Sequence, residues 1–136
     1  MATIVERHET LAITSGEDIV RVRQAVRAWV VELGLNLISQ TKLITAASEL
    51  ARNTVEFGGG GTVQLEIISN STHTGVRLTF EDHGPGIPDI ELALKDGYTT
   101  GTGLGLGLGG ARRLVNEFQI DSQVGRGTWV SIITWK

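Results

Sequence analysis

The sequence predicts an α/β (α+β) two-layer sandwich, with a mixed, largely antiparallel sheet and helices on one face, in a single domain over residues 1–136. Two amphipathic helical stretches follow each other in the first half of the chain. Two pairs of stretches that alternate apolar and polar residues, within 62–81 and 120–134, are typical of β-hairpins. A hydrophobic content of 40% is enough to cover one face of such a sheet with helices.

The composition argues against several classes of function. A net charge of −3 disfavours nucleic-acid binding, because such domains are usually basic. The chain has no cysteine, so it has neither a disulfide framework nor a cysteine-based zinc site. No apolar run approaches the ~20 residues of a membrane span, and the N-terminus lacks the apolar block of a signal peptide. We therefore expect a cytoplasmic protein with no nucleic-acid or membrane partner.

The N-terminal part is expected to hold a strand or two and then a helix. Residues 3–13 are predicted to form one or two short strands. Ser15 is the expected N-cap of the helix, and Gly34 is expected to end it. Its surface carries Arg21, Arg23 and Arg27, expected to be solvated. Its apolar residues recur at helical spacing, at Ile19, Val22, Val26, Trp29, Val30 and Leu33.

A second helix is predicted from about Ser39 to Phe57. At 100° per residue, Glu49 and Asn53 fall roughly opposite the centre of its apolar stripe, and their four-residue spacing makes them neighbours. An exposed polar pair is the simplest interpretation. Asparagine is a mediocre residue in mid-helix, however, so its presence asks for a functional reason. The stripe itself contains Leu43, Ala47, Leu50 and Thr54.

The second half of the chain alternates strands with glycine-rich segments. Gly58–Gly61 is expected to be a flexible joint. After it we expect a hairpin, a turn at Asp82–Ile87, a short helix, a mobile glycine-rich segment, a helix and a last hairpin. The first hairpin is expected at 62–69 and 75–81, and the last at 120–124 and 128–134. Between them, the short helix is expected at 88–96, the mobile segment at 97–110 and the longer helix at about 108–118.

The glycine run Gly101–Gly110 needs an explanation, because glycine loses the most backbone freedom on folding. No lysine follows it, which excludes a P-loop. Gly105–Gly110 spells G-x-G-x-x-G, but no apolar strand precedes it, so we regard that match as accidental. A flexible linker is the simple alternative, although linkers rarely interleave leucine so regularly. The remaining interpretation is a mobile lid that closes on ATP, with bare N–H groups facing phosphates.

Three separated pieces fit one ligand: Glu49-x-x-x-Asn53 on a helix, Asp82-x-Gly84-x-Gly86 after a strand, and the glycine run. In this order and on these elements they resemble the GHKL superfamily of ATP-binding domains, which includes gyrase, Hsp90, histidine kinases and MutL. The resemblance extends over about residues 40 to 130. It implies the Bergerat fold and a site for ATP and Mg²⁺.

The resemblance assigns the adenine end of the ligand to Asp82. A carboxylate can accept the exocyclic N–H of adenine, whereas a turn-capping aspartate would be the interpretation without the other pieces. Gly84 and Gly86 would let the backbone pass close to the purine, and Ile87 would cover a ring face. Thr128 matches the threonine of the family that reaches adenine directly or through water, although an ordinary strand threonine is nearly as good an interpretation.

At the phosphate end, the amide oxygen of Asn53 suits Mg²⁺, which takes most of its other ligands from water and phosphate. Glu49 occupies the position proposed as general base in the family. Gly103, Gly105 and Gly107 would donate N–H groups to the phosphates. Lys95 is more simply a surface lysine than a phosphate ligand. The ligand-binding segment as a whole comprises Gly101, Thr102, Gly103, Leu104, Gly105, Leu106 and Gly107.

Within the superfamily, the sequence resembles the stand-alone bacterial serine/threonine kinases, which include anti-sigma factors. We expect no transducer domain and no helix with a phosphoacceptor histidine. The RsbT-type switch kinases of the stressosome match most closely, on Thr45–Asn53, Leu92–Thr100 and Gly103–Phe118. That match implies phosphorylation of Ser or Thr on STAS-domain proteins. It also implies that the released kinase binds and activates a PP2C-type phosphatase or another output protein. An anti-sigma factor or a nucleotide-gated binding switch is the alternative.

Overall fold

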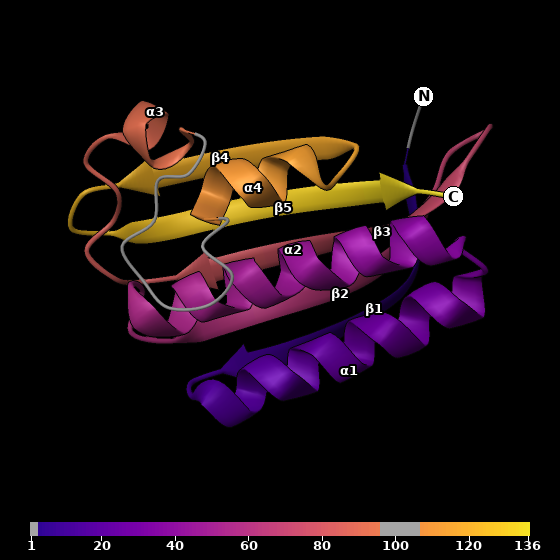
Figure 1. Ribbon diagram of the computed structural model, residues 1–136, viewed down its shortest axis with the longest axis horizontal. Coiled ribbons are helices and arrows are strands. Elements are labelled where there is room, and N and C mark those ends of the chain that lie inside the picture. The colour runs from indigo at the N-terminus through magenta and orange to yellow at the C-terminus, as the bar shows by residue number, and fades with distance from the viewer. Residues whose placement is uncertain (1–2, 96–106) are drawn as a thin grey trace.

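The computed structural model describes residues 3–95 and 107–136, which form a five-stranded sheet and four helices (Figure 1). The strands are β1 (Ile4–Ile13), β2 (Gly61–Ser69), β3 (Thr74–Asp82), β4 (Glu117–Gln123) and β5 (Gly127–Trp135). The helices are α1 (Gly16–Leu33), α2 (Leu37–Glu56), α3 (Ile90–Ala93) and α4 (Gly107–Arg113). None of these helices is long and apolar enough to cross a membrane.

The strand order is β1-β2-β3-β5-β4, and all four neighbouring pairs are antiparallel. β1 and β2 are antiparallel although two helices join them, because α1 and α2 each reverse the chain. β5 lies between β3 and β4, so those two strands run in the same direction without pairing. The helices cover one face of the sheet, which confirms the predicted two-layer sandwich (Figure 1).

The core lies between this face and the helices. Alternate residues of the central strands point into it, as the period of two in a strand requires, and α1 and α2 supply the opposite wall. Trp29 of α1 is buried beneath Arg7 of β1, whose guanidinium carbon lies 4.2 Å from the ring centroid. The fully buried side chains include Val22, Val26, Val30, Leu43, Leu65, Val76, Leu78 and Ile132.

The start of α1 is stabilised differently from the prediction. Ser15 occupies the N-cap position, but its side chain makes no capping hydrogen bond. Instead Asp18 accepts hydrogen bonds from the backbone N–H and the hydroxyl of Thr14, each at 2.8 Å. The bond from the Thr14 backbone is the main cause that lowers the pKa of Asp18. Gly34 ends the helix with φ of 85°, as expected for a left-handed C-cap.

Two helix boundaries and one surface residue differ from the predictions. α2 starts at Leu37, because Oδ1 of Asn36 accepts the Ser39 N–H at 2.8 Å and caps it. α4 ends at Arg113, five residues before the predicted end, because residues 117–123 pair with β5 as β4. Arg23 is not simply solvated, since its Nε donates to Ser48 Oγ of α2 at 3.0 Å. The predicted mobile segment lies mostly at residues 97–106, outside the described residues.

Candidate functional site

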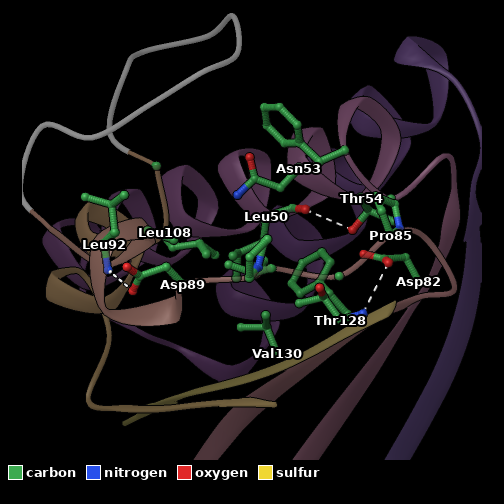
Figure 2. A pocket seen from close by; sticks show the side chains of 18 residues that line it. Leu50, Asn53, Thr54, Asp82, Pro85, Asp89, Leu92, Leu108, Thr128 and Val130 are labelled. Atoms are coloured by element: carbon green, nitrogen blue, oxygen red, sulfur yellow. Dashed lines mark hydrogen bonds between the residues drawn. The ribbon is translucent and has the colours of Figure 1, made fainter. Parts of the chain in front are cut away.

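A cavity of about 410 Å³ lies between the last turns of α2, the segment after β3, the start of α4 and strand β5 (Figure 2). Its volume is within the range of sites for small molecules. Figure 2 shows Asp82 beside Thr128 on one side and Asp89 with Leu92 on the other, while Asn53 projects from α2. The apolar lining includes Leu50, Phe57, Phe80, Ile87, Leu92, Leu108 and Val130.

One stripe of α2 forms a wall of the cavity. Leu50, Asn53, Thr54 and Phe57 follow the spacing of a single helix face, and all four line the space. The hydroxyl of Thr54 donates to the Leu50 carbonyl at 2.9 Å, so its proton is used within the helix. The side-chain amide of Asn53 is therefore the polar group that this stripe of α2 can offer to a ligand.

Glu49 lies one turn before Asn53 and is only 4% exposed. The simple interpretation of an exposed polar pair is therefore wrong for Glu49, whose side of α2 is buried as well. The described residues that line the cavity do not include Glu49. The structure thus places it next to the cavity wall rather than on solvent.

Asp82 is the last residue of β3, and two backbone groups hold its carboxylate. Its Oδ1 accepts the N–H of Gly84 at 3.0 Å and the N–H of Thr128 at 3.2 Å. Among the described residues its Oδ2 has no hydrogen-bond partner. Asp82 and Thr128 both line the cavity, so one oxygen orients the carboxylate and the other is available to a ligand.

Close backbone approaches explain the glycines around Asp82. A Cβ on Gly84 would lie 2.7 Å from Gly58 Cα, and a Cβ on Gly58 would collide with the Asp82 side chain. A Cβ on Gly86, whose φ is 79°, would collide with the Gln123 carbonyl oxygen. These contacts give the two glycines a structural reason, and Gly86 also lines the cavity, whereas Gly84 is not among the described lining residues. Their predicted role, letting the backbone pass close to the purine, stays a prediction. Gly58 is likewise a packing position and not the predicted flexible joint.

Sequence reasoning missed Ser122 of β4. Its Oγ accepts the Ile87 N–H at 2.8 Å and lies 2.8 Å from Thr128 Oγ1 and 3.2 Å from the Gly127 carbonyl oxygen. It thereby connects two residues that line the cavity. A serine at a half-buried position of a strand carries no signal in one sequence, because its partners lie on distant segments.

The glycine run enters the described structure only at its end. Gly107 has φ of 61° and lines the cavity with Leu108. A Cβ on Gly109 would collide with the Leu94 carbonyl oxygen, so this glycine allows α4 to approach the end of α3. Lys95 is exposed, as predicted. Residues 101–106, including Gly101, Gly103 and Gly105, lie outside the described residues.

Comparison with known proteins agrees with this arrangement. Residues 38–136 match the family of histidine kinase-, DNA gyrase B- and HSP90-like ATPases. The chain is 42% identical to the serine/threonine-protein kinase RsbT of Bacillus subtilis over 118 residues, which cover 87% of this chain and 89% of RsbT. It is 33% identical to the anti-sigma F factor of Anoxybacillus flavithermus, with 90% of this chain and 86% of that protein covered.

Two solved structures share the fold at 21% sequence identity each. The RsbU and RsbW domains of a Mycobacterium tuberculosis protein align with a TM-score of 0.67 over 96% of this chain and 33% of that one. The mycobacterial sensor histidine kinase MprB aligns with a TM-score of 0.55 over 95% of this chain and 97% of that one. These findings confirm the predicted resemblance to GHKL kinases of the RsbT type. The chain belongs to the family of histidine kinase-, DNA gyrase B- and HSP90-like ATPases, with RsbT and the anti-sigma F factors among its relatives.

Proposed function

We propose that the chain is an ATP-dependent serine/threonine protein kinase of a partner-switching pathway, with its ATP site in the cavity beneath α2. The observation that supports this most directly is Asp82, a carboxylate with one oxygen engaged and the other available at a cavity whose lining is mostly apolar. Similarity to RsbT supports the choice of protein Ser or Thr as the acceptor.

Adenine is the base that this end of the cavity suits. Oδ2 of Asp82 would accept the exocyclic amine of adenine, whereas a guanine in the same orientation would present its O6 carbonyl oxygen to the carboxylate and be repelled. Ile87, Phe80 and Val130 line the same cavity and would contact the apolar ring faces. Thr128 would add a hydroxyl beside the amine-binding oxygen.

The residues present fit a magnesium ion that arrives with the nucleotide. Within the described part of the chain, no three His, Asp or Glu side chains cluster as metal ligands. Asn53 offers one neutral oxygen at the cavity wall, which suits Mg²⁺ that keeps waters and phosphate oxygens as its other ligands. Such an ion would neutralise phosphate charge. The N–H groups of Gly107 and of Gly101–Leu106 would bind the phosphates.

Glu49 would act as the general base. It is buried one helical turn from Asn53, so a proton acceptor would lie close to the metal ligand. As the oxygen of the acceptor Ser or Thr bonds to the γ-phosphorus, Glu49 takes the hydroxyl proton. The bond from the γ-phosphorus to the bridging oxygen breaks, and ADP leaves with that oxygen.

The proposed protein substrates are STAS-domain proteins of a stressosome, and the proposed output is a PP2C-type phosphatase or another protein that the released kinase activates. The anti-sigma alternative rests on the 33% identity to an anti-sigma F factor over most of both chains. Pull-down against a sigma factor, a STAS protein and a PP2C phosphatase separates the two. Stable capture of the sigma factor would favour the anti-sigma function.

Glu49→Gln tests the chemistry apart from binding. We expect ATP affinity by calorimetry to stay within about threefold, while transfer of labelled phosphate to a STAS protein slows by about 10²–10⁴. Glu32→Gln on the exposed surface of α1 is the matched control and should behave as wild type. Transfer at the wild-type rate by Glu49→Gln would remove Glu49 from the mechanism. Phosphate transfer that persists in EDTA would show that the reaction does not need magnesium.

A further inference from the structure

Ser122 connects three segments behind the cavity wall without lining the cavity itself. Its hydroxyl meets the Ile87 N–H from the loop after β3, and the Thr128 hydroxyl and the Gly127 carbonyl from β5. The two shorter contacts are 2.8 Å each, near the preferred length for hydrogen bonds of hydroxyl groups. Ser122 thus acts on the cavity through Ile87 and Thr128, both of which line it.

The Ser122 hydroxyl has a single proton, and this limits which hydrogen bonds the Thr128 hydroxyl can make with a ligand. A serine hydroxyl has one proton and two lone pairs, and the Ile87 N–H takes one lone pair. If Ser122 donates its proton to the Gly127 carbonyl, Thr128 donates to Ser122 and offers a ligand only lone pairs. If Ser122 donates to Thr128 instead, the Thr128 proton is free for a ligand. The two hydroxyl groups are therefore coupled: Thr128 has a proton for a ligand only while Ser122 donates to Thr128.

Ser122 is also part of a clamp between the loop 82–88 and the β4–β5 hairpin. The other hydrogen bonds of the clamp run from Thr128 N–H to Asp82 Oδ1 at 3.2 Å and from Gly125 N–H to the Pro85 carbonyl at 2.9 Å. Two glycines allow this close contact, because a Cβ on Gly86 or Gly127 would collide with the backbone opposite. The clamp ties the loop that carries Ile87 to the strand that carries Thr128.

We propose that Ser122 is a positioning residue for base selection: it holds the backbone of Ile87 and donates to the Thr128 hydroxyl, which leaves the Thr128 proton for N1 of adenine. This inference rests on the proposed ATP site. N1 of adenine accepts a hydrogen bond, whereas N1–H of guanine donates one. A Thr128 hydroxyl that has lost its partner can satisfy either base, so the preference for ATP should fall together with the affinity for ATP.

The test compares ATP and GTP affinities of the full chain by calorimetry at fixed magnesium. Ser122→Ala should weaken ATP binding about tenfold, because it leaves the Ile87 N–H without its acceptor. GTP binding should change less, so the preference for ATP should fall about fivefold. Ser122→Thr keeps the hydroxyl and should restore the preference to within about twofold. Ser131→Ala removes a buried hydroxyl from β5 of the same hairpin and should leave the preference unchanged.

Coupling to Thr128 separates positioning from simple loss of stability. In a Thr128→Val background, Ser122→Ala should reduce the preference for ATP by less than about twofold further, since both changes remove the same interaction. Additive losses would overturn the proposal, as would a lower melting temperature of Ser122→Ala with an unchanged ATP-to-GTP ratio. A wild-type chain that binds neither nucleotide would instead overturn the proposed function.

Discussion

The two hairpins of the sheet have the same antiparallel pairing, but their turns are stabilised in different ways. The β2–β3 turn, residues 70–73, is stabilised by its own Asn70. Its Oδ1 accepts the N–H groups of Thr72 and His73 at 2.9 and 2.8 Å and the Thr72 hydroxyl at 3.0 Å. This turn satisfies its polar groups locally, as asparagine in a turn commonly does.

Besides one local bond, from the Arg126 N–H to the Gln123 carbonyl at 2.9 Å, the β4–β5 turn is held by a segment 35 to 46 residues earlier in the chain. Gly125 donates to the Pro85 carbonyl, Thr128 donates to Asp82, and Ser122 accepts from Ile87. The comparison indicates that the β4–β5 turn, which a distant loop holds, supports the candidate site. The β2–β3 turn, which Asn70 stabilises locally, has a structural role only. Three substitutions test this difference, in order of decreasing expected effect.

Gly127→Ala should have the largest effect. At φ of 126° an added Cβ would collide with the Asp82 carbonyl oxygen, so the turn must move away from β3. We expect about 2–4 kcal/mol of lost stability in urea unfolding and no measurable ATP binding by calorimetry. Gly125→Ala is the control, because its Cβ meets nothing within 4 Å and costs only the positive-φ strain of about 1 kcal/mol. Equal effects of the two substitutions would contradict the clamp.

Asp82→Asn should have an intermediate effect that is confined to binding. The amide oxygen can still accept from Gly84 and Thr128, so unfolding should change little. Loss of the charged acceptor should weaken ATP binding about ten- to hundredfold. Asp121→Asn on exposed β4 is the matched control and should bind ATP as wild type does. Unchanged affinity in Asp82→Asn would show that adenine does not meet this carboxylate.

Asn70→Ala should have the smallest effect on the site. It removes three hydrogen bonds of the β2–β3 turn, at a cost of about 1–2 kcal/mol in thermal or urea unfolding. The dissociation constant for ATP should stay within about twofold, because residues 70–73 contribute nothing to the described lining of the cavity. The exposed neighbour Ser71 provides the control, Ser71→Ala. A large loss of ATP affinity in Asn70→Ala alone would mean that the two turns are energetically coupled.

Much of this architecture could be predicted from local patterns. The apolar spacing from Ile19 to Leu33 and Gly34 beyond it predicted α1 closely, because helix period and C-cap chemistry are local properties. Asn53 and Asp82 were identified from residue type and spacing, and both line the cavity. The end of α4 was misplaced, since residues 114–118 can be read as either helix or strand and pairing with β5 decides between them.

The sequence by itself determined the order of elements, the two-layer class and two polar residues of the cavity wall, Asn53 and Asp82. It did so because periodicity, turn chemistry and side-chain functional groups are written along the chain. Tertiary structure alone decided that Glu49 is buried, that Gly84 and Gly86 face protein backbone, and that Ser122 joins Ile87 to Thr128. Each of these depends on a contact between segments far apart in the chain, and such contacts leave no local pattern.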